Sequence, residues 1–151
     1  MLYYENGDLL DDKYKIIVHQ GNCRGVMAAG LAKQIRNKFP NVYYDYIKAL
    51  KYENATLGHI IISHSDQRII ITMLAQDEYG TDKRYTDYDA FIKCLDVILS
   101  SVEIYSCKVW DSIAFPYKIG CGLAGGDWDI IKAILEKFSE KTKKKVIIVR
   151  K

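Results

Sequence analysis

Residues 15–30 read KIIVHQGNCRGVMAAG, in which a β-branched run leads directly into glycine and other small residues. Residues 15–20 predict a strand, and residues 28–39 predict a helix from their apolar positions and their helix-forming composition. Strand, loop and helix therefore follow one another. In an open α/β sheet this is a place where ligands bind, at the carboxyl end of a strand.

A second loop of the same kind spans residues 119–128, which read IGCGLAGGDW. It follows an apolar run over 109–115 and precedes a helical pattern over 127–138. Glycine lets backbone N–H groups approach an anion, and a helix that begins there adds its N-terminal dipole. Two such loops facing each other predict a site for the diphosphate of a nucleotide-like ligand. Glycine loops also form plain tight turns, and neither loop matches the Walker pattern or the dinucleotide G-x-G-x-x-G pattern.

The rest of the chain alternates short apolar runs with longer amphipathic segments. Further helices are expected at 41–52, begun by Pro40, and at 87–100, and further strands at 59–63, 68–73 and 146–149. The strands 59–63 and 68–73 are expected to pair as an antiparallel hairpin across the turn 65–67. Strands buried on both faces with helices between them indicate an α/β fold, a three-layer α/β/α sandwich with a mixed central sheet. With 151 residues and no linker, we expect a single domain over 1–151.

Composition excludes several classes of protein. No apolar run approaches the roughly 20 residues that span a bilayer, and the N-terminus lacks the features of a secretory signal, so we expect a cytoplasmic protein without a membrane partner. Cys23, Cys94, Cys107 and Cys121 are too far apart for a zinc motif or a disulfide framework, and reduced thiols are expected. We expect no metal and no cofactor.

The net charge of +3 is mild. Its clearest cluster, Lys141 with Lys143, Lys144 and Lys145, is expected to be a solvated helix end, where cations complement the helix dipole. Nucleic acid is not indicated as a partner, because basic residues and aromatics do not interleave in a recognised motif. A monomer is the default for a domain of this size and charge.

Four motifs together resemble the macro domain family across nearly the whole chain. They are Gly7-Asp8, the strand into His19-Gln20-Gly21-Asn22-Cys23, the helix start Gly30-Leu31-Ala32, and Ile119-Gly120-Cys121-Gly122-Leu123. Within that family the chain looks most like the small stand-alone branch that includes terminal ADP-ribose protein glycohydrolase and the ADP-ribose 1″-phosphate phosphatases. The resemblance implies the macro domain fold and a pocket for ADP-ribose.

The resemblance also implies roles for particular residues. Asp8 would accept a hydrogen bond from the adenine amino group with the backbone of Leu9 nearby, Asn22 would touch the distal ribose, and Arg150 would stack on adenine. The two loops would hold the diphosphate through Gly25, Val26, Met27, Ala28 and Gly30, and through Ile119, Gly120, Cys121, Gly122, Leu123, Ala124 and Gly125. Each side chain also has a plain alternative: a local turn or cap for Asp8, an amide bonded within its own loop for Asn22, and an exposed tail for Arg150.

Catalytic candidates are few. In the glycohydrolase branch a lysine before the third helix and an aspartate after Gly-Cys-Gly-Leu carry catalysis, whereas this sequence has Ala124 at the second position and offers Lys83 near the first. Asp127 instead resembles the acidic residue of the phosphatase-type relatives, although aspartate is also a common helix N-cap. A helix N-terminus would lower the pKa of Cys121, for which small-residue packing is the alternative role. For His19, a core imidazole and a catalytic base both remain open.

Two functions follow from these residues. The first is an enzyme that hydrolyses a substituent at the 1″ end of ADP-ribose, such as ADP-ribose 1″-phosphate, an ADP-ribosyl ester or O-acetyl-ADP-ribose, with Asp127, Asn22 and Lys83 as the catalytic candidates. The alternative is a non-catalytic ADP-ribose reader, which Ala124 favours. ADP-ribose or a derivative is the expected small-molecule ligand, and ADP-ribosylated protein is a candidate partner. An unrelated nucleotide-binding or interaction domain is a third reading.

Overall fold

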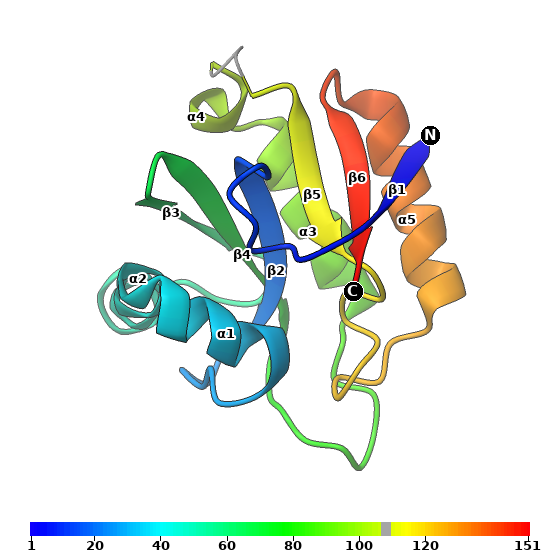
Figure 1. Cartoon of the computed structure of the whole chain (residues 1–151). Coiled ribbons are helices and arrows are strands. Elements are labelled where there is room, and N and C mark those ends of the chain that lie inside the picture. The colour runs from blue at the N-terminus through cyan, green and yellow to red at the C-terminus, as the bar shows by residue number, and fades with distance from the viewer. Residues whose placement is uncertain (107–109) are drawn as a thin grey trace.

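A six-stranded mixed sheet forms the centre of the molecule (Figure 1), seen in a computed structural model that describes residues 1–106 and 110–151. The strand order is β1-β6-β5-β2-β4-β3, and every neighbouring pair is parallel except β3 and β4. The strands are β1 (Leu2–Asn6), β2 (Ile16–Asn22), β3 (Ile60–Ser65), β4 (Arg68–Gln76), β5 (Ser112–Pro116) and β6 (Lys145–Arg150).

Helices cover both faces of this sheet (Figure 1). They are α1 (Gly30–Lys38), α2 (Pro40–Tyr52), α3 (Tyr88–Leu99), α4 (Val102–Tyr105) and α5 (Trp128–Lys141). One apolar cluster packs α1 and α2 on one face, and a second packs α3, α4 and α5 on the other. The central strands are buried on both faces, as β4 shows with eight buried positions in a row, Arg68–Ala75. The predicted three-layer sandwich with a mixed sheet is confirmed.

The predicted hairpin is also confirmed. β3 and β4 pair antiparallel from Ser65 opposite Arg68 to Ile60 opposite Met73. Asp66 and Gln67 form the turn with φ of 51° and 58°, and positive φ at both central residues matches the twist of the two strands. The two strands and two helices predicted around the loops hold to within a few residues. For example, α1 begins at Gly30 instead of residue 28, and α5 extends to Lys141.

Some of the structure differs from the sequence-based expectations. The edge strand β1 was not predicted, because it buries little beyond Leu2 and its partner β6 lies at the other end of the chain. The short helix α4 was not predicted either. Lys144 is 8% exposed and its ammonium donates to the Trp110 carbonyl, so the expectation of a wholly solvated lysine cluster is wrong at that residue. Val109, at the predicted start of β5, and Cys107 lie outside the described residues.

The loops after β2, β4 and β5 meet at one edge of the sheet, because these three strands are parallel and their carboxyl ends point the same way. Figure 1 shows these loops together on the lower side of the view, below the arrowheads of the strands. Both glycine loops of the sequence are among them. Within the described part of the chain, no helix is long and apolar enough to cross a membrane.

Candidate functional site

A cavity of about 640 Å³ opens at this edge, between the two glycine loops and the loop that follows β4. Its volume is in the usual range for small-ligand pockets. Among the described lining residues, Lys118 is the one lysine or arginine, and burial lowers the pKa of His19 to about 4. The lining consists of His19, Gln20, Gly21, Asn22, Val26, Ala28, Ala29, Gly30, Leu31, Ala32, Gln76, Tyr79, Gly80, Thr81, Pro116, Tyr117, Lys118, Ile119, Gly120, Gly122, Leu123 and Ala124.

The first wall of the cavity is the uncapped start of α1. Its N-cap is Ala29, which has no side chain able to cap, whereas Asp87, Ser101 and Asp127 cap α3, α4 and α5. The first intrahelical bond runs from Lys33 N to Ala29 O. Within the described residues, the N–H groups of Gly30, Leu31 and Ala32 therefore have no acceptor, and all three residues line the cavity.

The opposite wall supplies a second set of backbone donors. Cys121, Gly125 and Gly126 donate to carbonyls within their own loop. The N–H groups of Gly122, Leu123 and Ala124 find no acceptor in the described part of the chain, and these residues line the cavity as well. Two groups of residues with unpaired backbone N–H groups thus line a cavity that has no carboxylate among its described lining residues, an arrangement that favours an anion.

The first loop is held in shape by Asn22 and Tyr46. The Asn22 side-chain oxygen accepts from the backbone of Arg24 at 2.9 Å and of Val26 at 3.4 Å, and its Nδ2 donates to the Val26 carbonyl at 2.9 Å. From α2, the Tyr46 hydroxyl contacts the Asn22 carbonyl at 2.6 Å and Oδ1 at 2.8 Å, and accepts from Gly25 N at 3.0 Å. The alternative role of Asn22, an amide bonded within its own loop, is present in the structure.

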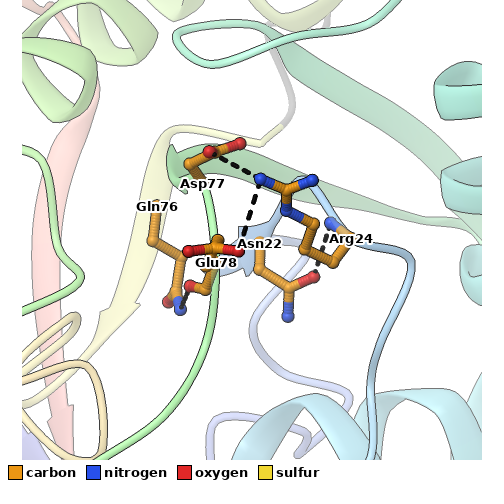
Figure 2. A network of polar contacts seen from close by, with 5 residues as sticks. All are labelled: Asn22, Arg24, Gln76, Asp77 and Glu78. Atoms are coloured by element: carbon orange, nitrogen blue, oxygen red, sulfur yellow. Dashed lines mark hydrogen bonds and ion pairs between the residues drawn. The ribbon is translucent and has the colours of Figure 1, made fainter. Parts of the chain in front are cut away.

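An exposed ion-pair network ties the first loop to the loop after β4, as Figure 2 shows. Arg24 extends toward Asp77 at 3.0 Å and Glu78 at 3.5 Å, and Gln76 donates to the Glu78 carbonyl. The backbone bond from Cys23 N to Asp77 O, at 2.9 Å, joins the same two segments. Because the ion pairs are exposed, they add little stability and mainly fix the relative position of the two loops.

The second loop is held by side chains from β2 and the segment before α3. The Thr86 hydroxyl donates to the Gly120 carbonyl at 2.6 Å, and Gly126 N donates to the same oxygen at 2.8 Å. Gln20 donates to both Thr86 and Gln76. A Cβ at position 126 would lie 2.5 Å from the Gly120 oxygen, so the close approach of the chain requires glycine there.

Part of the predicted ligand set lines the cavity, and part does not. The lining includes Asn22, Val26, Ala28, Gly30, Ile119, Gly120, Gly122, Leu123 and Ala124. Gly25, Met27, Cys121 and Gly125 belong to the same loops but lie outside the lining. The sequence did not indicate the lining residues Gln20, Gln76 and Tyr79, nor the supporting residues Tyr46 and Thr86. Of these, only Gln20 could have been suspected from the sequence, because it stands next to Gly21 at the start of the first loop.

The residues predicted to contact adenine lie together at the ends of β1 and β6. The Asp8 carboxylate accepts a hydrogen bond from Leu10 N at 2.9 Å, which is the local turn given above as the alternative to adenine binding. The same carboxylate lies 3.7 Å from the Lys151 ammonium. Leu9 is buried, and its carbonyl accepts from Arg68. Arg150 stacks over Tyr4 and also over Tyr117, whose ring lines the cavity. This group therefore adjoins the cavity through an aromatic side chain.

The catalytic candidates Asp127 and Lys83 lie outside the cavity lining. Asp127 caps α5 by accepting from Asp129 N at 2.8 Å, as its alternative role predicted. Lys83 is exposed with its ammonium over the Tyr85 ring, and its backbone packs against the second loop near Gly125.

Burial sets the pKa of two further groups. His19 is 1% exposed and bonds to the Thr72 hydroxyl at 2.7 Å, and burial lowers the pKa of this imidazole to about 4. Of the two roles considered for His19, the structure thus favours the buried core imidazole, because a side chain with this pKa is a poor base near neutral pH. Burial also raises the pKa of the Cys121 thiol to about 11, with a smaller effect from Asp127, so the expected lowering is wrong. Cys23, Cys94 and Cys121 are free thiols, and the described residues hold no cluster suited to a metal ion.

Known proteins resemble this chain in sequence and in fold. The chain is 27% identical over 145 residues to the DNA ADP-ribosyl glycohydrolase of Mycobacterium tuberculosis, covering 93% of this chain but 39% of that protein. It is 28% identical over 169 residues to the ADP-ribose 1″-phosphate phosphatase of Debaryomyces hansenii, covering 92% of this chain and 94% of the relative.

Among solved structures, the macrodomain of Mycobacterium tuberculosis DarG superposes with a TM-score of 0.80 at 26% identity, covering 99% of this chain and 97% of that structure. The family model for the Macro domain matches residues 18–135, a segment that contains both glycine loops and most of the sheet. Because this model matches most of the chain, the chain belongs to the Macro domain family.

Proposed function

We propose that this chain binds ADP-ribose in the cavity and hydrolyses a substituent from its 1″ end, the 151 residues acting as one macro domain. The observation that carries the proposal is that the backbone N–H groups of residues 30–32 and of residues 122–124 have no acceptor among the described residues, and that both segments line the cavity. A diphosphate has the charge and the acceptor oxygens to satisfy both groups. The names of the two relatives, a glycohydrolase and a phosphatase of ADP-ribose derivatives, support the reaction class.

The chemistry requires attack of water at the 1″ group, with the water proton passing to a base and the bonding pair leaving with the departing group. Asp127 and Lys83 are the proposed participants, and Asn22 is the proposed contact to the distal ribose. ADP-ribosylated DNA, which the mycobacterial relative is named for, and ADP-ribosylated protein are the candidate macromolecular carriers. A reducing compartment such as the cytoplasm fits the free thiols of Cys23, Cys94 and Cys121 in the described part of the chain, and a monomer is the proposed oligomeric state.

A specific observation favours a second candidate, a non-catalytic ADP-ribose reader. Ala124 stands where the glycohydrolase branch has aspartate, and Asp127 and Lys83 are both outside the cavity lining. In this candidate the amides and Asn22 bind ADP-ribose, and no group is placed to activate water.

The binding proposal is tested by calorimetry with ADP-ribose on Leu31→Pro and Leu31→Ala. Leu31 N–H has no acceptor in the described residues, so proline removes one donor without breaking a helical bond, and the first turn of a helix tolerates proline. The alanine variant controls for the lost side chain. We expect proline to weaken binding about tenfold relative to alanine, the factor for one charge-assisted hydrogen bond. Equal affinities would exclude the amide site.

The choice between enzyme and reader is tested by turnover of ADP-ribose 1″-phosphate, O-acetyl-ADP-ribose and ADP-ribosylated DNA. Asp127→Asn keeps a side-chain oxygen for the N-cap and removes the carboxylate, and Asp129→Asn is the neighbouring control. The enzyme proposal expects turnover that Asp127→Asn abolishes and Asp129→Asn retains. ADP-ribose binding without turnover of any substrate would establish the reader instead.

A further inference from the structure

The Tyr46 hydroxyl lies in the apolar layer beneath the first loop, on a side chain that is 0% exposed. Its ring packs among apolar side chains of α1, α2 and the sheet, where phenylalanine would fill the same space. The oxygen, however, lies within hydrogen-bond distance of three groups of one short segment: Asn22 O, Asn22 Oδ1 and Gly25 N. Burial raises the pKa of this phenol to about 12, so the proton stays on and Tyr46 remains a donor.

These contacts determine which way the Asn22 amide faces. Its oxygen accepts from the N–H groups of Arg24 and Val26, and its nitrogen donates to the Val26 carbonyl. The single proton of the Tyr46 hydroxyl is shared between this oxygen, at 2.8 Å, and the Asn22 carbonyl, at 2.6 Å. Reversing the amide would turn an NH₂ group toward the two backbone N–H donors. Figure 2 shows the oxygen directed at the backbone of Arg24 and the nitrogen on the other side.

One Nδ2 proton of Asn22 is left over, because an amide nitrogen has two protons and the Val26 carbonyl takes one. Asn22 is 7% exposed and lines the cavity. It can therefore offer a donor to a ligand but hardly an acceptor, since its oxygen already accepts from two backbone N–H groups and lies 2.8 Å from the Tyr46 hydroxyl. A ribose hydroxyl or ring oxygen, acting as acceptor, suits this arrangement.

We propose that Tyr46 is a positioning residue for substrate recognition, holding Asn22 with its free N–H ready for an oxygen of the distal ribose. The inference rests on the proposed function, because it assumes that ADP-ribose is the ligand. It adds a residue from α2, 24 positions away in sequence and outside the cavity lining, to the binding machinery.

The test compares ADP-ribose with ADP, which lacks the distal ribose, in calorimetric titrations of Tyr46→Phe. Losing an orienting hydrogen bond is expected to weaken ADP-ribose binding about tenfold and to leave ADP binding unchanged. Tyr44→Phe, on the same helix but 71% exposed, is the control and is expected to bind both ligands as the wild type does. Equal weakening of both ligands would show that the hydroxyl only stiffens the loop, and would overturn the proposal.

A double-mutant cycle supplies a second readout. If Tyr46 acts through Asn22, the double variant Tyr46→Phe with Asn22→Ala binds ADP-ribose no more weakly than Asn22→Ala alone. Additive losses would contradict the proposal.

A third measurement needs no ligand and covers the case in which the variant binds poorly for other reasons. In selectively ¹⁵N-asparagine-labelled protein, the Asn22 side-chain amide protons should exchange faster in Tyr46→Phe than in the wild type or Tyr44→Phe. Unchanged exchange would refute the orienting role. Failure of the wild-type protein to bind ADP-ribose would instead refute the proposed function, and so the two failures are distinguishable.

Discussion

Acidification should destabilise this protein through His19, a buried imidazole beside the cavity. Its pKa is about 4 in the folded protein and 6.5 as the ordinary value. The unfolded chain therefore binds a proton at a pH where the folded chain does not, and the free energy of unfolding falls as the pH drops through this interval. The effect is absent above about pH 7 and complete below about pH 4.

The size of the effect follows from the two pKa values. Between about pH 7 and about pH 5 the unfolded state gains about 2 kcal/mol from protonating this one side chain, and the total at lower pH is about 3 kcal/mol. Carboxylates titrate in the same interval, so the comparison must be with a variant that lacks only this imidazole. His19→Gln retains a polar side chain for the Thr72 hydroxyl and does not titrate.

The assay is urea unfolding of the wild type and His19→Gln at about pH 7 and about pH 5. The wild type should lose about 2 kcal/mol more than the variant over this range. His64→Gln, which replaces a histidine that is 61% exposed, serves as control and should follow the wild type. Equal losses in the wild type and His19→Gln would refute the reasoning, because burial would then not suppress protonation.

Three further predictions concern the stability of the structure around the site. Gly126→Ala should cost about 1–3 kcal/mol in urea unfolding, because its Cβ meets the Gly120 carbonyl, whereas Gly122→Ala meets nothing and should stay within about 0.5 kcal/mol of the wild type; similar values for both would contradict the close contact. Arg68→Met should cost about 3 kcal/mol, because the Arg68 guanidinium donates to four backbone carbonyls in residues 9–14, next to Asp8, the proposed adenine contact. A neutral result would mean that water replaces the guanidinium. Asp87→Ala should cost about 1 kcal/mol by removing the α3 cap, and thermal unfolding that matches the wild type would exclude that cap.

The strands, loops and helices around the site could be predicted from the sequence because each is indicated by a short continuous stretch of residues. A β-branched run, a glycine and a helical pattern follow one another at 15–30 and again around 119–128, and the hairpin is contained within 60–76. Parallel strands then bring both loops to one edge of the sheet. The cavity lies between these loops, as expected for an open α/β sheet.

The supporting contacts could not be predicted because they join residues far apart in sequence. Tyr46 reaches Asn22 from α2, and Thr86 reaches Gly120 across 34 positions. In the sequence, a tyrosine on an apolar helix face and a threonine before a helix look like ordinary core and cap residues. β1 was missed for the same reason, since only its pairing with β6 makes it a strand.

Because β1 and β6 pair in parallel, residues 1 and 151 lie at opposite ends of these strands, and only residue 151 is near the cavity. Met1 lies by Ser139 near the end of α5, at the far end of the strands from the cavity, whereas Lys151 lies 3.7 Å from Asp8 on the cavity side. A peptide fused after Lys151 would start next to the proposed adenine contact, and a fusion before Met1 would start on the opposite side. Affinity tags and immobilisation linkers therefore belong at the amino end, where they leave ligand entry open.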